Sequence, residues 1–158
     1  MLSEEDYYNR LVYEAKILEE EEPSFKPVGG DLRVWKGFIL GTGLYEGGVF
    51  EIQITLSPKF PYEPPKVRWI TKTYHPNISI QNKVCIGILG KDWVPTMSVA
   101  GLIEGLRNLL NFPNPASPLN TEAANLMKKD MQKYEAEVRK YVTAYATWEN
   151  LKKSQADG

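Results

Sequence analysis

The sequence has little of the chemistry on which most metal sites and redox centres depend. Its 158 residues include one cysteine and one histidine. A single cysteine cannot form an internal disulfide, and one of each residue falls short of the four ligands of a closed zinc site. The net charge of −1 gives no basic field for nucleic acid, and the apolar runs are far shorter than the ~20 residues of a membrane helix. We therefore expect no metal, nucleic acid or membrane partner.

Length and composition indicate one globular domain. Apolar residues make up 42% and charged residues 25% of the chain, which is ordinary for soluble proteins. We treat residues 1–158 as a single domain with a frayed end at about 154–158. An unpaired thiol fits a reducing compartment, and the acidic start of the chain lacks the apolar core of a signal peptide. We expect a cytoplasmic protein, with access to the nucleus if the source is a eukaryote.

Hydrophobic periodicity predicts an α+β architecture. The sequence begins with an expected helix over residues 3–20, and three strand-like runs joined by short glycine- and proline-rich turns predict an antiparallel meander. Residues 71–97 show little periodicity, and a loop of this length is usually functional. Helices are expected after it, starting at Ser98, at about Asn120 and near Asp130. The strand-like runs are Arg33–Leu40, Val49–Leu56 and Lys66–Ile70.

Two of these helices have a one-sided apolar pattern, which predicts the face that each buries. The stripe of the first helix is Tyr8, Leu11, Ala15 and Leu18. The seam of the last helix is Met131, Tyr134, Val138, Tyr141, Tyr145 and Trp148.

The single cysteine, Cys85, stands ten residues after His75, the first residue of the tripeptide His75-Pro76-Asn77. It is either a small buried hydrophobe or a nucleophile, and Lys83 nearby favours the reactive thiolate. His75 can act as a base for Cys85, with Asn77 orienting it, as in cysteine hydrolases, or it can hold loop backbone groups. The Asn77 amide can donate to a developing oxyanion or serve as a turn residue.

Six motifs, in one order and with matching gaps, resemble those of the ubiquitin-conjugating enzymes over about residues 5–150. The motifs are Tyr45-Glu46-Gly47-Gly48-Val49-Phe50, Phe60-Pro61-Tyr62-Glu63-Pro64-Pro65-Lys66-Val67, His75-Pro76-Asn77-Ile78, Val84-Cys85-Ile86, Trp93-Val94-Pro95 and Pro113-Asn114-Pro115. The resemblance implies an N-terminal helix, a four-stranded antiparallel sheet, an irregular active-site loop and three C-terminal helices.

The resemblance also implies a reaction. Cys85 would receive the C-terminal glycine of ubiquitin or a ubiquitin-like protein from an activating enzyme. Because that enzyme uses the ATP, this chain would need no cofactor of its own. A lysine of a protein substrate or a ligase cysteine would then attack the thioester. Asn77 would stabilise the oxyanion or order the loop, and His75 would support the loop. The family usually acts as a monomer. A non-catalytic ubiquitin-binding scaffold of the same fold and a cysteine hydrolase remain the alternatives.

The chain departs from the family pattern beside Cys85. Many members that transfer to lysine carry acidic residues where this sequence has Gly87 and Ser117. We therefore expect slow intrinsic transfer to lysine, strong dependence on a ligase, or transfer to a ligase cysteine. Because Pro118 follows Ser117, phosphorylation could supply the missing charge, although an ordinary turn or cap serine is the simpler interpretation.

The resemblance predicts a ligase-binding surface, of the RING or cysteine type, where two loops meet. Its residues are Pro61, Tyr62, Val94, Pro95 and Thr96. Exposed aromatic residues often dominate binding energy, but Tyr62 can instead cap the core. Trp93 is expected to support the catalytic loop from inside.

The resemblance also predicts contacts with the activating enzyme on the first helix, at Asp6, Tyr7 and Arg10. The acidic start of this helix departs from the basic residues common in the family, so we expect poor charging by a standard ubiquitin-activating enzyme. A solvated face that complements the helix dipole is the other interpretation. Ser24 marks the place where the family can bind a second ubiquitin.

Overall fold

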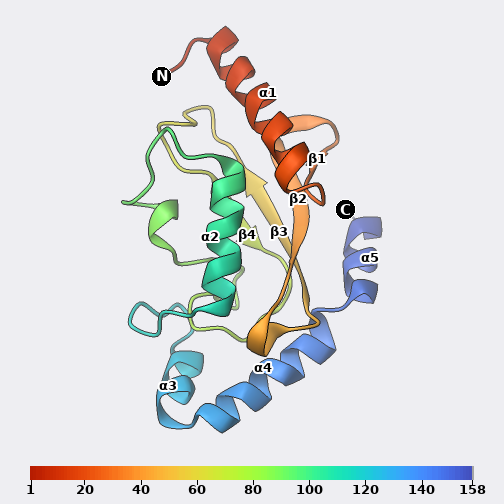
Figure 1. Cartoon of the computed structure of the whole chain (residues 1–158), viewed down its shortest axis with the longest axis vertical. Helices are drawn as coiled ribbons and strands as arrows, with labels where there is room; N and C mark the ends of the chain where they lie inside the picture. Colours follow the sequence, from red (N-terminus) through yellow and green to blue (C-terminus); the bar gives the residue numbers. More distant parts are fainter. Residues whose placement is uncertain (158) are drawn as a thin grey trace.

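A four-stranded antiparallel sheet forms the centre of the computed structural model, which describes residues 1–157 (Figure 1). The strands lie in sequence order, so the predicted meander is confirmed. Their bounds are β1 Lys26–Val28, β2 Asp31–Leu40, β3 Val49–Thr55 and β4 Lys66–Trp69. The first strand is too short, and too interrupted by Pro27, to show a strand pattern in the sequence.

Five α-helices surround the sheet (Figure 1). Side chains of Ser3, Ser98 and Asn120 cap the first three helices by accepting hydrogen bonds from their first turns. The predicted starts of these helices are therefore confirmed. The helices are α1 Glu4–Glu21, α2 Val99–Asn111, α3 Thr121–Lys129, α4 Met131–Tyr145 and α5 Trp148–Asp157, with short 3-10 turns η1 Gly43–Tyr45 and η2 Gly87–Leu89.

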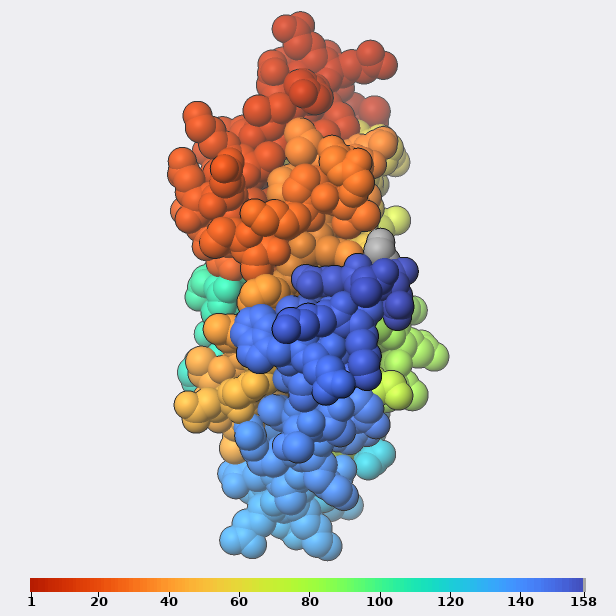
Figure 2. All heavy atoms as spheres, turned by 90° about the vertical axis from the view of Figure 1, so that its right-hand side faces the viewer, coloured from red at the N-terminus to blue at the C-terminus, as the bar shows by residue number. Residues whose placement is uncertain are grey.

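The C-terminal region differs from the prediction, because it contains one more helix. The helix expected to continue past Trp148 ends at Tyr145, where the Asn150 amide donates to the carbonyls of Ala144 and Tyr145. The chain then turns and starts α5, which lies across the face of the molecule seen in Figure 2. The frayed end predicted from residue 154 is wrong for residues 154–157, which are helical; Gly158 lies outside the described residues.

Helix α5 is held against β2 and β3. The rings of Trp148 and Phe38 meet edge to face, with their centroids 5.2 Å apart. The Ser154 hydroxyl donates to the carboxylate of Glu51 on β3. Trp148 therefore packs on the sheet rather than continuing the seam of α4.

The apolar face of α2 forms the middle of the core. Leu102, Ile103 and Leu106 are almost completely buried, together with Ile52 and Ile54 of β3. This burial fixes α2 against the sheet, and the C-terminal end of α2 then supports the functional loop. None of the helices within residues 1–157 is long and apolar enough to cross a membrane.

The predicted apolar faces of α1 and α4 are partly correct. Leu11 and Leu18 of α1 and Tyr134 and Val138 of α4 are buried. Tyr8, in contrast, is 61% exposed, so its place in the stripe of α1 is wrong. Exposed positions also occur at Met131, Tyr145 and Trp148 in the predicted C-terminal seam.

Candidate active site

Cys85 lies at the edge of an open cavity. Its side chain is partly exposed, and its backbone N–H donates to the carbonyl of Asn77 over 2.9 Å. The cavity has a volume of about 420 Å³, and its walls include Gly87, Asp92 and Ser117. Cys85 is therefore not sealed in the core, and its interpretation as a small buried hydrophobe is wrong.

His75 is a structural histidine. Its side chain is completely buried, its Nδ1 accepts the backbone N–H of Asn77 over 3.0 Å, and its Nε2 lies 2.8 Å from the carbonyl of Leu109. Because Nδ1 accepts a hydrogen bond, the proton of the neutral ring lies on Nε2, which donates to Leu109. Burial lowers the pKa of His75 to about 4. Both nitrogens are occupied, so the ring is not available to take a proton from Cys85.

Asn77 braces the loop through its side chain. Its Oδ1 accepts the backbone N–H of Asn114 over 2.8 Å, and its Nδ2 donates to the carbonyls of Asn114 and Ser117 over 2.8 and 3.1 Å. The side chain is 1% exposed. Since both amide hydrogens already have acceptors, this geometry favours the loop-ordering role over donation to an oxyanion.

The positions that depart from the family pattern both line the cavity. Ser117 is exposed, and Gly87 contributes only backbone to the wall. Asp92 also lies in the wall, and sequence reasoning missed it. Its only sequence signal was its place directly before Trp93, a motif residue.

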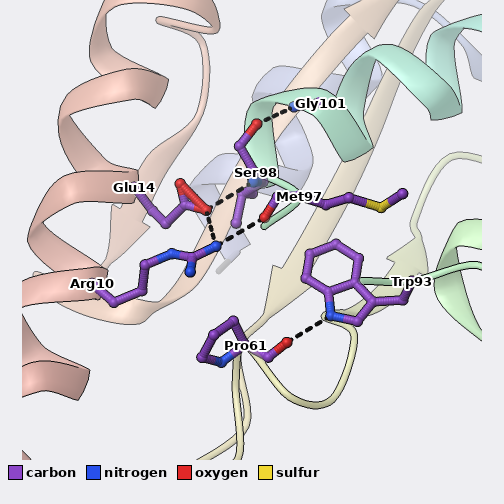
Figure 3. A network of polar contacts seen from close by, with 8 residues as sticks. Arg10, Glu14, Pro61, Trp93, Met97, Ser98 and Gly101 are labelled. Atoms are coloured by element: carbon purple, nitrogen blue, oxygen red, sulfur yellow. Dashed lines mark hydrogen bonds and ion pairs between the residues drawn. The ribbon is translucent and has the colours of Figure 1, made fainter. Parts of the chain in front are cut away.

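The predicted ligase surface is largely exposed. Tyr62 is 55% and Val94 46% exposed, and Pro95 and Thr96 are exposed beside them. Tyr62 therefore does not cap the core. Pro61 is buried, and its carbonyl accepts the indole N–H of Trp93 over 2.7 Å (Figure 3).

This bond joins the two loops from inside, and the expected supporting role of Trp93 is confirmed. The Trp93 side chain is buried, and its ring packs on Phe60 with 6.1 Å between centroids.

Helix α1 is connected to the same region by a buried ionic network (Figure 3). The Arg10 guanidinium donates to the Met97 carbonyl over 2.9 Å and lies 3.5 Å from the Glu14 carboxylate, which accepts the N–H of Val99. Burial raises the pKa of Glu14, while Arg10 opposes this effect. The Arg10 guanidinium is therefore paired with groups of this protein.

The other residues predicted to contact the activating enzyme differ in their availability. Tyr7 is half-buried, and its hydroxyl donates to the Ser57 carbonyl over 2.8 Å. Asp6 is exposed. Ser24, the predicted second modifier site, bonds both the N–H and the carbonyl of Phe38. A role in binding at these residues stays a prediction.

No group of three or more histidine, cysteine, aspartate or glutamate residues within 1–157 is arranged to hold a metal ion. The lining of the cavity includes the thiol of Cys85, the amides of Asn77 and Asn114, and the carboxylate of Asp92. The expected absence of a cofactor stays a prediction.

Comparison with known proteins agrees with the fold. The family model for ubiquitin-conjugating enzymes matches residues 8–142. A relative described as ubiquitin-conjugating enzyme E2 2, from Kluyveromyces lactis, is 32% identical over 153 residues, covering 94% of this chain and 92% of that protein. The solved E2 domain of a Toxoplasma gondii ubiquitin-conjugating enzyme superposes with a TM-score of 0.82 at 32% identity, covering 89% of this chain and 99% of that one. The chain belongs to the ubiquitin-conjugating enzyme family, whose members are transferases.

Replacing Asn77 with alanine should destabilise the protein. The change leaves the N–H of Asn114 and the carbonyls of Asn114 and Ser117 without their partner, and we expect the free energy of unfolding to fall by ~1–3 kcal/mol. Urea unfolding measures this loss, with Asn108→Ala at an exposed position of α2 as the matched control. A variant with normal stability and slow transfer of the modifier would contradict the loop-ordering role of Asn77 and indicate a role at the reacting carbonyl.

The buried His75 ring should make stability fall in mild acid. Unfolded histidine binds a proton near pH 6.5 and the folded ring near pH 4, so the unfolded state binds more protons between these values. The free energy of unfolding should therefore decrease as the pH falls through this range, by up to ~3 kcal/mol. Denaturant unfolding at several pH values should show a shallower dependence for His75→Gln; equal dependence in both proteins would contradict this account.

Proposed function

We propose that this chain accepts ubiquitin or a ubiquitin-like modifier from an activating enzyme as a thioester on Cys85. It then passes the modifier to a substrate lysine, usually with a RING-type ligase, or to a ligase cysteine. The observation that carries the proposal is the partly exposed thiol of Cys85 at an open cavity in a chain of this family. An extended peptide tail can approach a thiol placed in this way.

The chemistry of loading is a thioester exchange. The Cys85 thiolate attacks the carbonyl carbon of the modifier's last glycine, a new C–S bond forms, and the thiolate of the activating enzyme leaves. The free energy of the thioester bond comes from the ATP that the activating enzyme has consumed. This chain therefore has to present the nucleophile and shape the groove, and it needs no nucleotide of its own.

The geometry supports the transferase over the hydrolase alternative. A cysteine hydrolase needs a histidine that can take the proton from the thiol. His75 is buried and donates to Leu109 while accepting from Asn77, so it has no free nitrogen for this task. The presence of Cys85 at the cavity argues against the non-catalytic scaffold.

Cys85→Ser should trap the modifier as an oxyester. A serine ester resists thiol reductants, whereas the wild-type thioester does not, so the band on a gel should become insensitive to reductant. The experiment incubates the protein with ATP and with matched pairs of activating enzyme and modifier, ubiquitin first. Cys85→Ala provides the control. Adducts that form equally on Cys85→Ala, or no wild-type adduct with any pair, would overturn the proposed function.

Tyr62→Ala should weaken the response to a ligase without affecting loading. An exposed aromatic residue at the centre of an interface often contributes 2 kcal/mol or more, so stimulation by a RING-type ligase should drop roughly tenfold or more. Tyr13, which is 59% exposed on α1, offers the matched control Tyr13→Ala. Discharge of the loaded protein with and without ligase measures the effect, and unchanged stimulation in Tyr62→Ala would place the ligase elsewhere.

A further inference from the structure

The carboxylate of Asp92 occupies the space that a side chain at residue 87 would need. A Cβ added to Gly87 would overlap Oδ2 of Asp92. The backbone of Gly87 does not have a positive φ, so a side chain at this position would meet no backbone strain but would require the Asp92 carboxylate to shift. The two residues therefore share one small volume in the wall of the Cys85 cavity.

A hydrogen-bonded turn holds Asp92 in this place. The backbone N–H of Asp92 donates to the Gly87 carbonyl over 3.0 Å, and the N–H of Gly90 donates to the same carbonyl over 2.9 Å. The next residue, Trp93, is anchored in the core through its bond to Pro61. The backbone that carries the carboxylate is thus fixed relative to the loop that carries Cys85.

We propose that Asp92 is the carboxylate that receives the incoming lysine, an inference that rests on the proposed function. Among the described residues that line this cavity, Asp92 is the only acidic one, and Lys91 is the only basic one. Neither Gly87 nor Ser117 carries an acidic group, whereas Asp92, five residues after Gly87, places one in the wall of the same cavity.

The carboxylate assists an amine more than a thiol. A free lysine has a pKa of about 10.4, so it arrives as an ammonium ion, which Asp92 attracts. After one proton leaves to water, the neutral amine attacks the thioester carbonyl and positive charge develops on its nitrogen, where Asp92 stabilises it. The C–N bond forms, the C–S bond breaks, the Cys85 thiolate leaves, and the second amine proton passes to Asp92 and then to water. A thiolate nucleophile develops no positive charge and has no proton to lose.

Asp92→Asn should therefore slow the transfer to lysine selectively. The wild type and the variant are first loaded with ubiquitin, or with the modifier that forms the thioester in the screen described above, and the activating enzyme is then stopped. Free lysine or 2-mercaptoethanol is added, and the loss of the thioester is followed over time. We expect discharge to lysine to slow at least tenfold and discharge to the thiol to stay unchanged. Glu135→Gln, an exposed carboxylate on α4, is the matched control and should match the wild type.

Moving the carboxylate provides a second test. Gly87→Asp combined with Asp92→Gly places an acidic side chain in the same gap from the other residue, and lysine discharge should recover toward the wild-type rate. Gly87→Asp alone crowds Asp92 and should not be faster than the double variant.

Three outcomes would overturn the inference. These are a normal lysine rate in Asp92→Asn, an equal slowing with lysine and with thiol, and no recovery in the double variant. Each of them leaves the proposed function intact if the thioester has formed. Failure of the wild type to form any thioester overturns the proposed function and this inference together.

Discussion

The loop that carries Cys85 depends on two buried polar side chains that replace the hydrogen bonds of regular secondary structure. His75 bonds the end of α2 through Leu109 and the backbone of Asn77, and Asn77 bonds the segment at Asn114 and Ser117. Buried polar groups are costly unless they are paired, so each of these bonds restricts the loop to one arrangement. The backbone carbonyl of Asn77 then holds the N–H of Cys85. The position of the thiol follows from this small buried set.

The same loop is also fixed at its C-terminal end, near Trp93 and Met97. Trp93 attaches the loop to Pro61, and Arg10 attaches Met97 to α1 (Figure 3). These buried contacts leave Tyr62 and Val94 on the surface, while Cys85 lines the cavity together with residues of the turn at 87–92. One framework of buried contacts therefore holds Cys85 at the cavity and keeps Tyr62 exposed on the surface.

Much of the fold could be predicted from the sequence because its signals are local. Ser3, Ser98 and Asn120 stand at the helix starts that their capping chemistry indicated, and the long strands have the expected pattern. The break between α4 and α5 was missed because apolar residues continue at helical spacing through Trp148. The contacts at the break, the Asn150 amide on the carbonyls that end α4 and the Trp148 ring on Phe38, cannot be inferred from that spacing.

Contacts between residues distant in sequence, and the shape of the turn near Cys85, could not be predicted from such local signals. Glu14 occupies the buried stripe of α1 only because Arg10 and the N–H of Val99 partner its carboxylate, and Val99 is distant in sequence. Cys85, His75 and Asn77 stood out through residue chemistry and motif order. Asp92 did not, since its closeness to Gly87 depends on the shape of a turn that the sequence alone does not reveal.

Site-resolved amide hydrogen exchange tests the central claim, that the loop around Cys85 is held rigidly by its buried side chains. The N–H of Asn77 donates to the His75 ring. The N–H of Cys85 donates to the backbone carbonyl of Asn77, and the N–H of Asn114 donates to the side-chain oxygen of Asn77. The account predicts that these three amides exchange as slowly as amides of β3 and α2, although they lie outside any helix or long strand. Exchange at the rate of an open surface loop would contradict it.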